Sequence, residues 1–224
     1  MARWGSPARR IAGVLGLVFT ALVAAACVES PLPQSTIHPV SDFGWKIQDL
    51  YVLIFWLAVF VFVVVEGVLL YAVLRFRRRP DDGLPPQIHG NARLEVAWTL
   101  APAVILAIIA VPTVRTIFDT QSNPPQDALE IRVVGHQWWW EVQYPDHNIV
   151  TANEVRVPVG QPVLIKLESV DVIHSFWVPR VGGKMDVVPN HVNQMWFTVD
   201  TPGVYPGQCV EFCGTQHANM KFVL

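Results

Sequence analysis

Two long apolar runs dominate the first half of the chain, and shorter apolar runs separated by turns fill the second half. Residues 50–74 carry one charge, Glu66, and residues 96–114 carry none. At about 1.5 Å per residue the two runs reach roughly 37 Å and 28 Å, enough to cross a hydrocarbon core of about 30 Å. Pro102 and Pro112 lie in the second run, where a membrane helix tolerates them. The pattern predicts a transmembrane hairpin over residues 49–118, with spans at about 50–74 and 96–116.

The N-terminal residues have the pattern of an export signal. Three arginines precede an uncharged run that ends in Ala24-Ala25-Ala26-Cys27. This predicts a cleaved signal peptide over residues 1–26, followed by an exported segment over residues 27–48. Small residues before a cysteine are also typical of bacterial lipoprotein signals, although Ala24 stands where that pattern usually has Leu. Lipidation of Cys27 and ordinary cleavage after Ala26 both stay open.

The loop between the two apolar runs is basic. Arginines at 75, 77, 78, 79 and 93 outnumber the acidic residues Asp81 and Asp82. Since cytoplasmic loops carry the excess of Lys and Arg, this loop is expected inside the cell. The mature N-terminus and everything after Arg115 are then expected outside.

The second half has the pattern of a β domain. Short runs rich in β-branched and aromatic residues lie at Leu129–Val134, Val155–Val159, Val163–Leu167 and Met195–Val199, with Gly and Pro turns between them. Several short strands at this spacing predict a sandwich or barrel over residues 119–224.

Composition and charge narrow the class of protein. Apolar residues make up 52% of the chain and charged residues only 15%, which argues against a disordered or wholly soluble protein. Residues 119–224 hold 11 acidic and 6 basic residues, a charge of −5, whereas residues 1–118 hold 10 basic and 7 acidic residues, a charge of +3. The negative second half argues against nucleic acid as a partner.

The residues that carry chemistry lie near the end of the chain. Cys209, Cys213, His217 and Met220 fall within 12 residues, and thiolate, thioether and imidazole together suit copper. The two cysteines alone would also fit a disulfide, but the added His and Met favour a metal. A second metal would need another imidazole, for which His174 is the best candidate. Taken alone, a histidine on a strand is more often a core residue.

Several segments resemble subunit II of the haem-copper cytochrome c oxidases, over roughly Phe43–Leu224. The loop Cys209–Met220 is similar to the copper A motif of that family, and Asp171-Val-Ile-His174 to its upstream histidine segment. Gly135-His136-Gln137-Trp138-Trp139-Trp140 resembles its aromatic segment, and Leu94-Glu95-Val96-Ala97-Trp98-Thr99 the start of its second span.

The resemblance implies a bacterial subunit with two transmembrane helices and an all-β, cupredoxin-like Greek-key domain. It assigns a dinuclear copper A centre to His174, Cys209, Cys213, His217, Met220 and the main-chain carbonyl of Glu211. The Glu211 carboxylate would help bind a magnesium ion shared with subunit I. Electrons from cytochrome c would enter at Trp138, and Glu95 would stand at the mouth of a proton path.

The implied function is that of an oxidase subunit, catalysing nothing alone, that passes electrons from cytochrome c to subunit I for oxygen reduction and proton pumping. Subunit III is a further expected partner. The expected location is the bacterial inner membrane, with both termini and the copper domain on the periplasmic side.

Several features receive no firm role from the resemblance. Glu66 is expected to have a packing or interface role, Asp171 fits either an acidic docking patch or a solvated strand end, and Trp139 or Trp140 is expected in the core. The sequence contains no Cys-x-x-Cys-His, so no covalent haem is expected. Because family members continue beyond Leu224, we expect an incomplete C-terminus, with Lys221–Leu224 as an unpaired sheet edge.

Three other functions share some of these features. A membrane-anchored copper carrier or chaperone is the alternative from a different class, and readily released or single copper would favour it. A quinol-oxidase homologue would lack the copper ligands that are present here. A relay similar to nitrous-oxide reductase would share the copper motif, but it does not account for two spans with Glu95-Val-Ala-Trp98.

Overall fold

The computed structural model describes residues 13, 14, 16–18, 20, 21, 32–77, 83 and 87–224. The chain divides into two compact units, Met1–Leu32 and Pro33–Leu224, and the second unit holds the helices and strands described below. The expected signal cleavage site and Cys27 lie outside the described residues, as do Arg78, Arg79, Asp81 and Asp82 of the basic loop.

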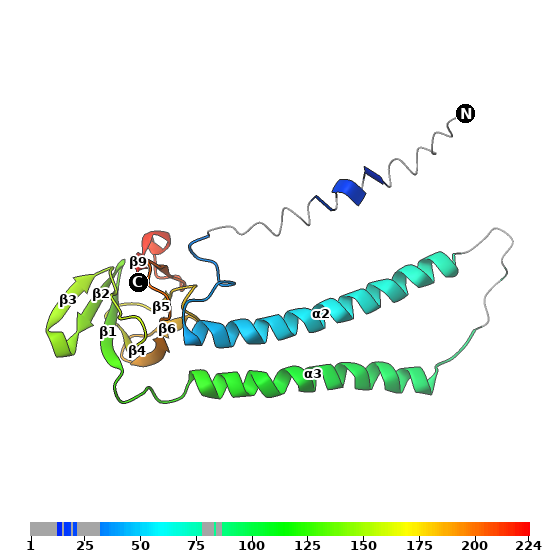
Figure 1. Ribbon diagram of the computed structural model, residues 1–224, viewed down its shortest axis with the longest axis horizontal. Coiled ribbons are helices and arrows are strands. Elements are labelled where there is room, and N and C mark those ends of the chain that lie inside the picture. Colours follow the sequence, from blue (N-terminus) through cyan, green and yellow to red (C-terminus); the bar gives the residue numbers. More distant parts are fainter. Residues whose placement is uncertain (1–12, 15, 19, 22–31, 78–82, 84–86) are drawn as a thin grey trace. The chain divides into compact units, whose positions relative to one another are not determined.

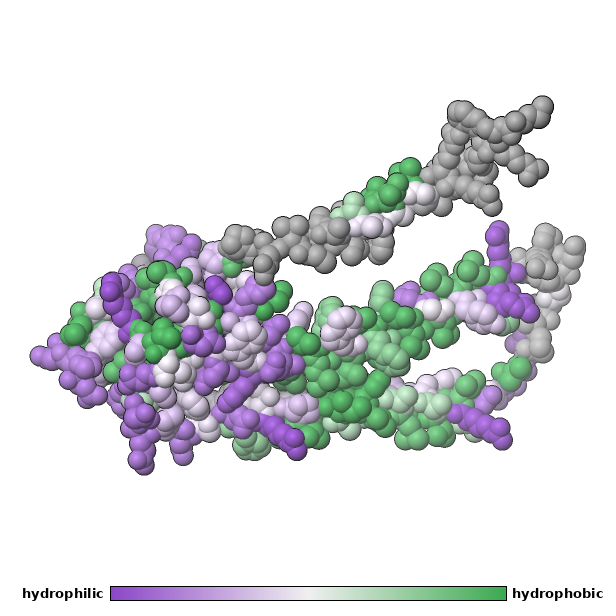
Figure 2. Space-filling view, viewed as in Figure 1, coloured by the Kyte–Doolittle hydropathy of each residue, from purple (hydrophilic) through white to green (hydrophobic). Residues whose placement is uncertain are grey.

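Two long apolar helices form the expected hairpin (Figure 1). They are α2 (Asp42–Arg75) and α3 (Ala92–Thr120), and both are long and apolar enough to cross a membrane. Their side chains are largely exposed, and Figure 2 shows hydrophobic residues along both of them. A helix that exposes apolar residues on all sides requires an apolar solvent.

Both helices begin before the apolar runs do, because polar residues cap them. The Ser41 hydroxyl accepts a hydrogen bond from the Gly44 N–H at 3.0 Å, so the first turns of α2 lie within the expected exported segment 27–48. The Asn91 side chain accepts from the first N–H groups of α3. Pro102 and Pro112 both lie inside α3 without ending it, as expected for a membrane helix.

The remaining chain forms a two-sheet β-sandwich. The first sheet has the order β3 (Ile149–Ala152), β2 (Trp139–Tyr144), β1 (Leu129–His136), β4 (Pro162–Ser169) and β7 (Asn193–Thr198). The second has the order β6 (Met185–Val187), β5 (His174–Trp177), β8 (Pro206–Cys209) and β9 (Lys221–Val223). Short 3-10 helices lie at η1 (Pro145–His147) and η2 (His217–Asn219). Strands β1 and β4 pair in parallel, and the other pairs are antiparallel.

Aromatic residues from both sheets meet in the core. The buried ring of Trp140, on β2, packs edge-on against Phe176 of β5 and Phe222 of β9, with 5.6 Å between ring centroids in each case. Phe176 and Phe222 stack on each other at 4.4 Å. This cluster joins the sheets, and it confirms that one of the two uncertain tryptophans belongs to the core.

The prediction of a strand at Val155–Val159 is wrong. Residues 155–159 form no strand, although Val155 is buried. Glu154, just before the segment, makes a single bridge with Val223, and Pro158 has no N–H to donate to a ladder. Val155 and Val157 pack against the core of the sandwich without extending a sheet.

The prediction that Lys221–Leu224 forms an unpaired sheet edge is also wrong. On one side β9 pairs with β8. On the other side the Val223 carbonyl accepts from the Val155 N–H at 2.8 Å, and the Val223 N–H donates to Asn153 at 3.0 Å. Asn153 and Val155 therefore cover the edge of β9 and help to hold the end of the loop that carries the candidate ligands.

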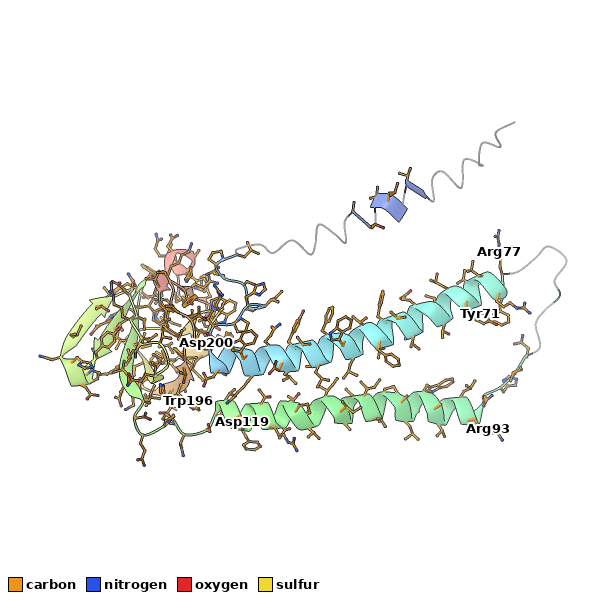
Figure 3. All side chains as sticks on the ribbon, viewed as in Figure 1. Tyr71, Arg77, Arg93, Asp119, Trp196 and Asp200 are labelled. Atoms are coloured by element: carbon orange, nitrogen blue, oxygen red, sulfur yellow. The ribbon has the colours of Figure 1, made fainter. Side chains whose placement is uncertain are left out.

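The start of α2 is anchored on the β-sandwich. The Val40 N–H donates to Arg180, the Asp200 N–H donates to Val40, and the Trp45 indole donates to the Asp200 carboxylate, each at 2.9 Å. Trp196 of β7 donates to the carbonyl of Ser122, just after α3, at 2.8 Å. Figure 3 labels Asp200 and Trp196 at this junction.

The anchor depends on a glycine. The Phe43 ring lies so close to Gly182 that an added Cβ would stand 2.4 Å from it, whereas a Cβ on Gly183 would stand 3.4 Å away. We expect Gly182→Ala to lower the free energy of unfolding of the purified full chain by about 1–3 kcal/mol, since the ring must move. Denaturant unfolding should show this loss, with Gly183→Ala close to the parent. Equal effects of the two changes would contradict the packing.

Candidate metal centre

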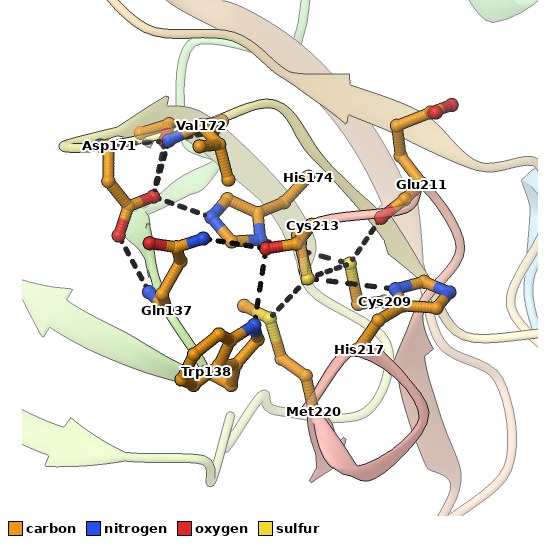
Figure 4. Close-up of polar contacts among 11 residues, drawn as sticks. Gln137, Trp138, Asp171, Val172, His174, Cys209, Glu211, Cys213, His217 and Met220 are labelled. Carbon is orange, nitrogen blue, oxygen red and sulfur yellow. Dashed lines mark hydrogen bonds and ion pairs between the residues drawn. The ribbon is translucent and has the colours of Figure 1, made fainter. Parts of the chain in front are cut away.

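Three separate parts of the second sheet bring the candidate ligands together (Figure 4). His174 begins β5, Cys209 ends β8, and the loop after β8 carries Cys213, His217 and Met220. Phe176 of β5 pairs with Cys209 of β8, so the two strands set the distance between the His174 ring and the first thiol. A histidine distant in sequence thus joins the loop, as the sequence predicts.

The two thiols lie between the two imidazoles. Cys209 and Cys213 are free, and their sulfur atoms are 3.8 Å apart, whereas a disulfide bond is about 2.05 Å long. The Cys209 Sγ is 3.9 Å from His174 Nδ1, and the Cys213 Sγ is 3.6 Å from His217 Nδ1. Each thiol therefore has its own imidazole.

Two further donors complete the cluster. The Met220 sulfur lies 3.8 Å from the Cys213 sulfur, and the Glu211 carbonyl oxygen lies 3.3 Å from the Cys209 sulfur. His174, the two thiols and Met220 are buried, with at most 5% of each residue exposed. Water therefore has little access to the donor atoms.

The chemistry of this donor set fits copper. Ligand atoms of His174, Cys209 and Cys213 all lie within 4.8 Å of one another. Metal–sulfur bonds of about 2.3 Å are long enough for one ion to contact both thiols across 3.8 Å. Thiolate and thioether favour Cu(I), and imidazole binds both oxidation states.

The electrostatics of the metal-free pair also favour a cation. Burial opposes ionisation of Cys209, but several hydrogen bonds, the one with His174 foremost, together outweigh it and lower the pKa of this thiol to about 6. Burial and the neighbouring charge on Cys209 raise the pKa of Cys213 to about 12. Ionisation of one thiol therefore opposes ionisation of the other, and a cation beside the pair would favour the second thiolate.

Asp171 orients the His174 ring. Burial lowers the pKa of His174, but hydrogen bonds to Cys209 and Asp171 outweigh it and raise that pKa. The ring contacts the Asp171 carboxylate through Nε2 at 2.8 Å, which leaves Nδ1 facing the thiols. Burial would raise the pKa of Asp171, yet its hydrogen bonds lower it. Asp171 is thus engaged with a candidate ligand and is not simply a solvated strand end.

Gly135–Trp140 lies against both ligand-bearing segments. A Cβ on Gly135 would stand 2.8 Å from the His174 ring, so only glycine allows the ring to approach β1 this closely. The half-buried indole of Trp138 donates to the Cys213 carbonyl at 3.2 Å. Gln137 donates to the same carbonyl at 2.7 Å through its side chain, and to Asp171 at 2.6 Å through its main-chain N–H.

Sequence reasoning missed two of these contacts. The three-residue spacing of Asp171 and His174 could have indicated their pairing, because a carboxylate often binds the second nitrogen of a metal-bound histidine. Gln137 carries no such local signal, since its partners are 34 and 76 residues away.

The remaining candidate residues lie apart from the sulfur cluster or face away from it. The Glu211 side chain points away from the thiols, and only its carbonyl faces them (Figure 4). The Glu95 carboxylate, in the first turn of α3, accepts the Asn91 N–H at 3.0 Å, so it helps to cap the helix. Glu66 lines an otherwise apolar groove of about 420 Å³ between α2 and α3. The exposed Trp139 ring stacks on His136 at 4.4 Å.

Comparison with known proteins gives two family matches. Residues 40–116 match the model for the transmembrane domain of cytochrome C oxidase subunit II, and residues 148–224 match the model for its periplasmic domain.

Individual relatives support the same family. A cytochrome c oxidase subunit 2 from Alkalihalophilus pseudofirmus is 38% identical, over 94% of this chain and 63% of its own length. A probable cytochrome c oxidase subunit 2 from Rickettsia bellii is 32% identical, over 94% of this chain and 87% of its own length. A quinol oxidase subunit 2 from Bacillus cereus is 32% identical, over 84% of this chain and 67% of its own length. The chain thus spans only 63% of the first of these relatives.

A solved structure was also found. The periplasmic domain of cytochrome oxidase subunit II from Bradyrhizobium japonicum aligns with 44% of this chain and 83% of that domain, at 33% identity and a TM-score of 0.43.

Two membrane-spanning helices that carry a β-sandwich with a buried sulfur and imidazole cluster define a membrane-anchored protein with a candidate metal site. The matches make the family specific: the chain belongs to the cytochrome c oxidase subunit II family. The expected fold, two transmembrane helices followed by a cupredoxin-like β domain, is confirmed. One relative is a quinol oxidase subunit, so membership of the family does not by itself identify the electron donor.

The contact between Asp171 and His174 leads to a test. We expect Asp171→Asn to weaken copper binding by about 10- to 100-fold, because the neutral amide orients and polarises the imidazole less well. Competition with a chelator on the purified full chain measures this loss. Asp146→Asn, the same change in the exposed η1 helix, is the matched control. Parental affinity in the Asp171 variant would contradict the role given to this carboxylate.

Proposed function

We propose that this chain is the electron-accepting subunit of a bacterial cytochrome c oxidase and holds a dinuclear copper A centre. The observation that carries the proposal is the pair of buried thiols, 3.8 Å apart, with one imidazole beside each. The proposed ligands are His174, Cys209, Cys213, His217, Met220 and the carbonyl of Glu211. When bound by these residues, two coppers would share one electron, so that little rearrangement would accompany each transfer.

The protein around the ligands serves this use. Burial keeps water from the sulfur atoms, and the Asp171 carboxylate fixes one imidazole. Strand pairing between β5 and β8 holds His174 and Cys209 on a rigid sheet. Ligands that are held rigidly move little when the charge of the metal centre changes. This lowers the free-energy cost of reorganisation during electron transfer.

Trp138 is proposed as the point where electrons enter. Its indole is partly exposed to solvent and bonds to the carbonyl of Cys213, so a single hydrogen bond joins the surface to a ligand residue. The charge of −5 on residues 119–224 would attract a cationic cytochrome c and raise the encounter rate. The presence of all copper ligands favours this donor over a quinol.

The two acidic residues outside the sulfur cluster have proposed roles at the contact with subunit I. The Glu211 carboxylate, which faces away from the thiols, would help to bind a magnesium ion there. Glu95 would receive protons at the cytoplasmic end of α3. Subunit III is a further proposed partner, and proton pumping belongs to the assembled enzyme.

The proposed location is the bacterial inner membrane, with both termini and the β-sandwich on the periplasmic side. The charges of the hairpin support this orientation, because Arg77 and Arg93 lie where the helices approach their connecting loop (Figure 3). Residues 1–26 would be the cleaved signal peptide. Lipidation of Cys27 can be tested by the mass of the mature N-terminus.

The role of Trp138 can be tested in the assembled oxidase. We expect Trp138→Phe to reduce electron transfer from reduced cytochrome c to a small fraction of the parental rate, because the hydrogen bond to Cys213 is lost. Stopped-flow spectroscopy of the copper band measures the rate. Trp139→Phe is the matched control, since its neighbouring ring stacks on His136. Equal rates in the two variants would count against Trp138 as the entry point.

Readily released copper in the parent chain would instead favour a copper carrier.

The role of Glu95 is separable from its helix cap. We expect Glu95→Gln to slow turnover of the oxidase while the copper spectrum stays unchanged. The Gln side chain can still accept the Asn91 N–H, so the cap is kept and only the ionisable group is lost. Oxygen consumption measures turnover, and Glu66→Gln serves as the control in the other span. Parental turnover of the Glu95 variant would remove it from the proton path.

A further inference from the structure

Gln137 is the residue that connects both ligand-bearing segments. Its main-chain N–H donates to one oxygen of Asp171 at 2.6 Å, and the other oxygen of Asp171 contacts His174 at 2.8 Å. Its side-chain amide donates to the Cys213 carbonyl at 2.7 Å. One residue outside the ligand set therefore reaches the His174 segment and the cysteine loop at once (Figure 4).

The carbonyl that Gln137 contacts is a critical point of the loop. It belongs to Cys213, and the next residue, Gly214, has a φ of +120°, which side-chain-bearing residues rarely adopt. The Gly214 carbonyl then accepts the His217 N–H at 3.1 Å. The orientation of this peptide therefore affects both a thiol and the imidazole beside it.

Gln137 and Trp138 share this carbonyl as their acceptor. The hydrogen bond from the Gln137 amide, at 2.7 Å, is shorter than the hydrogen bond from the Trp138 indole, at 3.2 Å. A Cβ on Gly214 would stand 3.1 Å from the Gln137 amide nitrogen and 3.2 Å from the indole nitrogen, so both donors lie directly on the turn. Without the amide, the peptide would be held by the longer bond alone.

We propose that the Gln137 side chain is a positioning residue for the metal centre: it fixes the Cys213–Gly214 peptide, and through it the Cys213 thiol, the His217 ring and the Trp138 indole. The inference rests on the proposed function for its copper readouts. The Gln137 side chain is exposed. It is linked to the candidate ligands through its hydrogen bond to the Cys213 carbonyl. Its loss should therefore leave the β-sandwich folded.

Two substitutions separate the hydrogen bond from charge. Gln137→Met keeps a similar length but removes the donor, whereas Gln137→Glu keeps the shape, removes the donor and adds a negative charge. Gln161→Glu is the matched control, because the Gln161 amide also donates to a main-chain carbonyl, that of Asp127, at 3.4 Å. Each variant is made in the full chain and purified in detergent.

The first readout needs no copper. In the metal-free chain we expect the His217 N–H to exchange with solvent about three- to tenfold faster in both Gln137 variants, as the loss of one net hydrogen bond predicts. The second readout uses the copper-loaded chain. There we expect about three- to tenfold faster copper loss to a chelator and a shifted reduction potential in both variants, with neither change in Gln161→Glu.

The outcomes are distinct. Parental exchange, copper loss and potential in Gln137→Met would overturn the inference, and so would a change confined to Gln137→Glu, which would report charge alone. If the parent chain binds no copper, the proposed function fails, but the exchange of the His217 N–H in the metal-free chain still decides the role of Gln137.

Discussion

The centre depends on one electrostatic constraint: two thiols 3.8 Å apart in a buried site oppose each other's ionisation, and a cation beside them would favour the doubly ionised pair. The constraint explains why the two pKa values separate, to about 6 for Cys209 and about 12 for Cys213. A cation held by this donor set would offset the repulsion between the two thiolates.

The rest of the fold holds that arrangement in place. The Trp140, Phe176 and Phe222 cluster joins the two sheets beside His174, whose ring lies 5.8 Å from Trp140. The segment Gly135–Trp140 supports both ligand-bearing loops, and Val223 closes the end of the cysteine loop by pairing on both sides. The anchor at Phe43 and Trp45 ties this rigid domain to α2.

The sequence predicts what depends on local pattern. The length of the two apolar runs predicts both membrane spans. The residue types and spacing of the cysteine loop, together with His174, predict the candidate metal site. Long-range pairing is not visible. Val155–Val159 has the composition of a strand but lies beside β9 without forming one, and the closed edge at Val223 depends on that same contact. Gln137 was missed because its partners are distant in sequence.

The most direct test of the account is electron paramagnetic resonance of the full chain loaded with copper. The account predicts hyperfine structure from one unpaired electron shared over two equivalent copper nuclei, because two thiols would bridge the ions. The pattern of a single copper nucleus, or copper lost to a mild chelator while Cys209 and Cys213 form a disulfide, would contradict it.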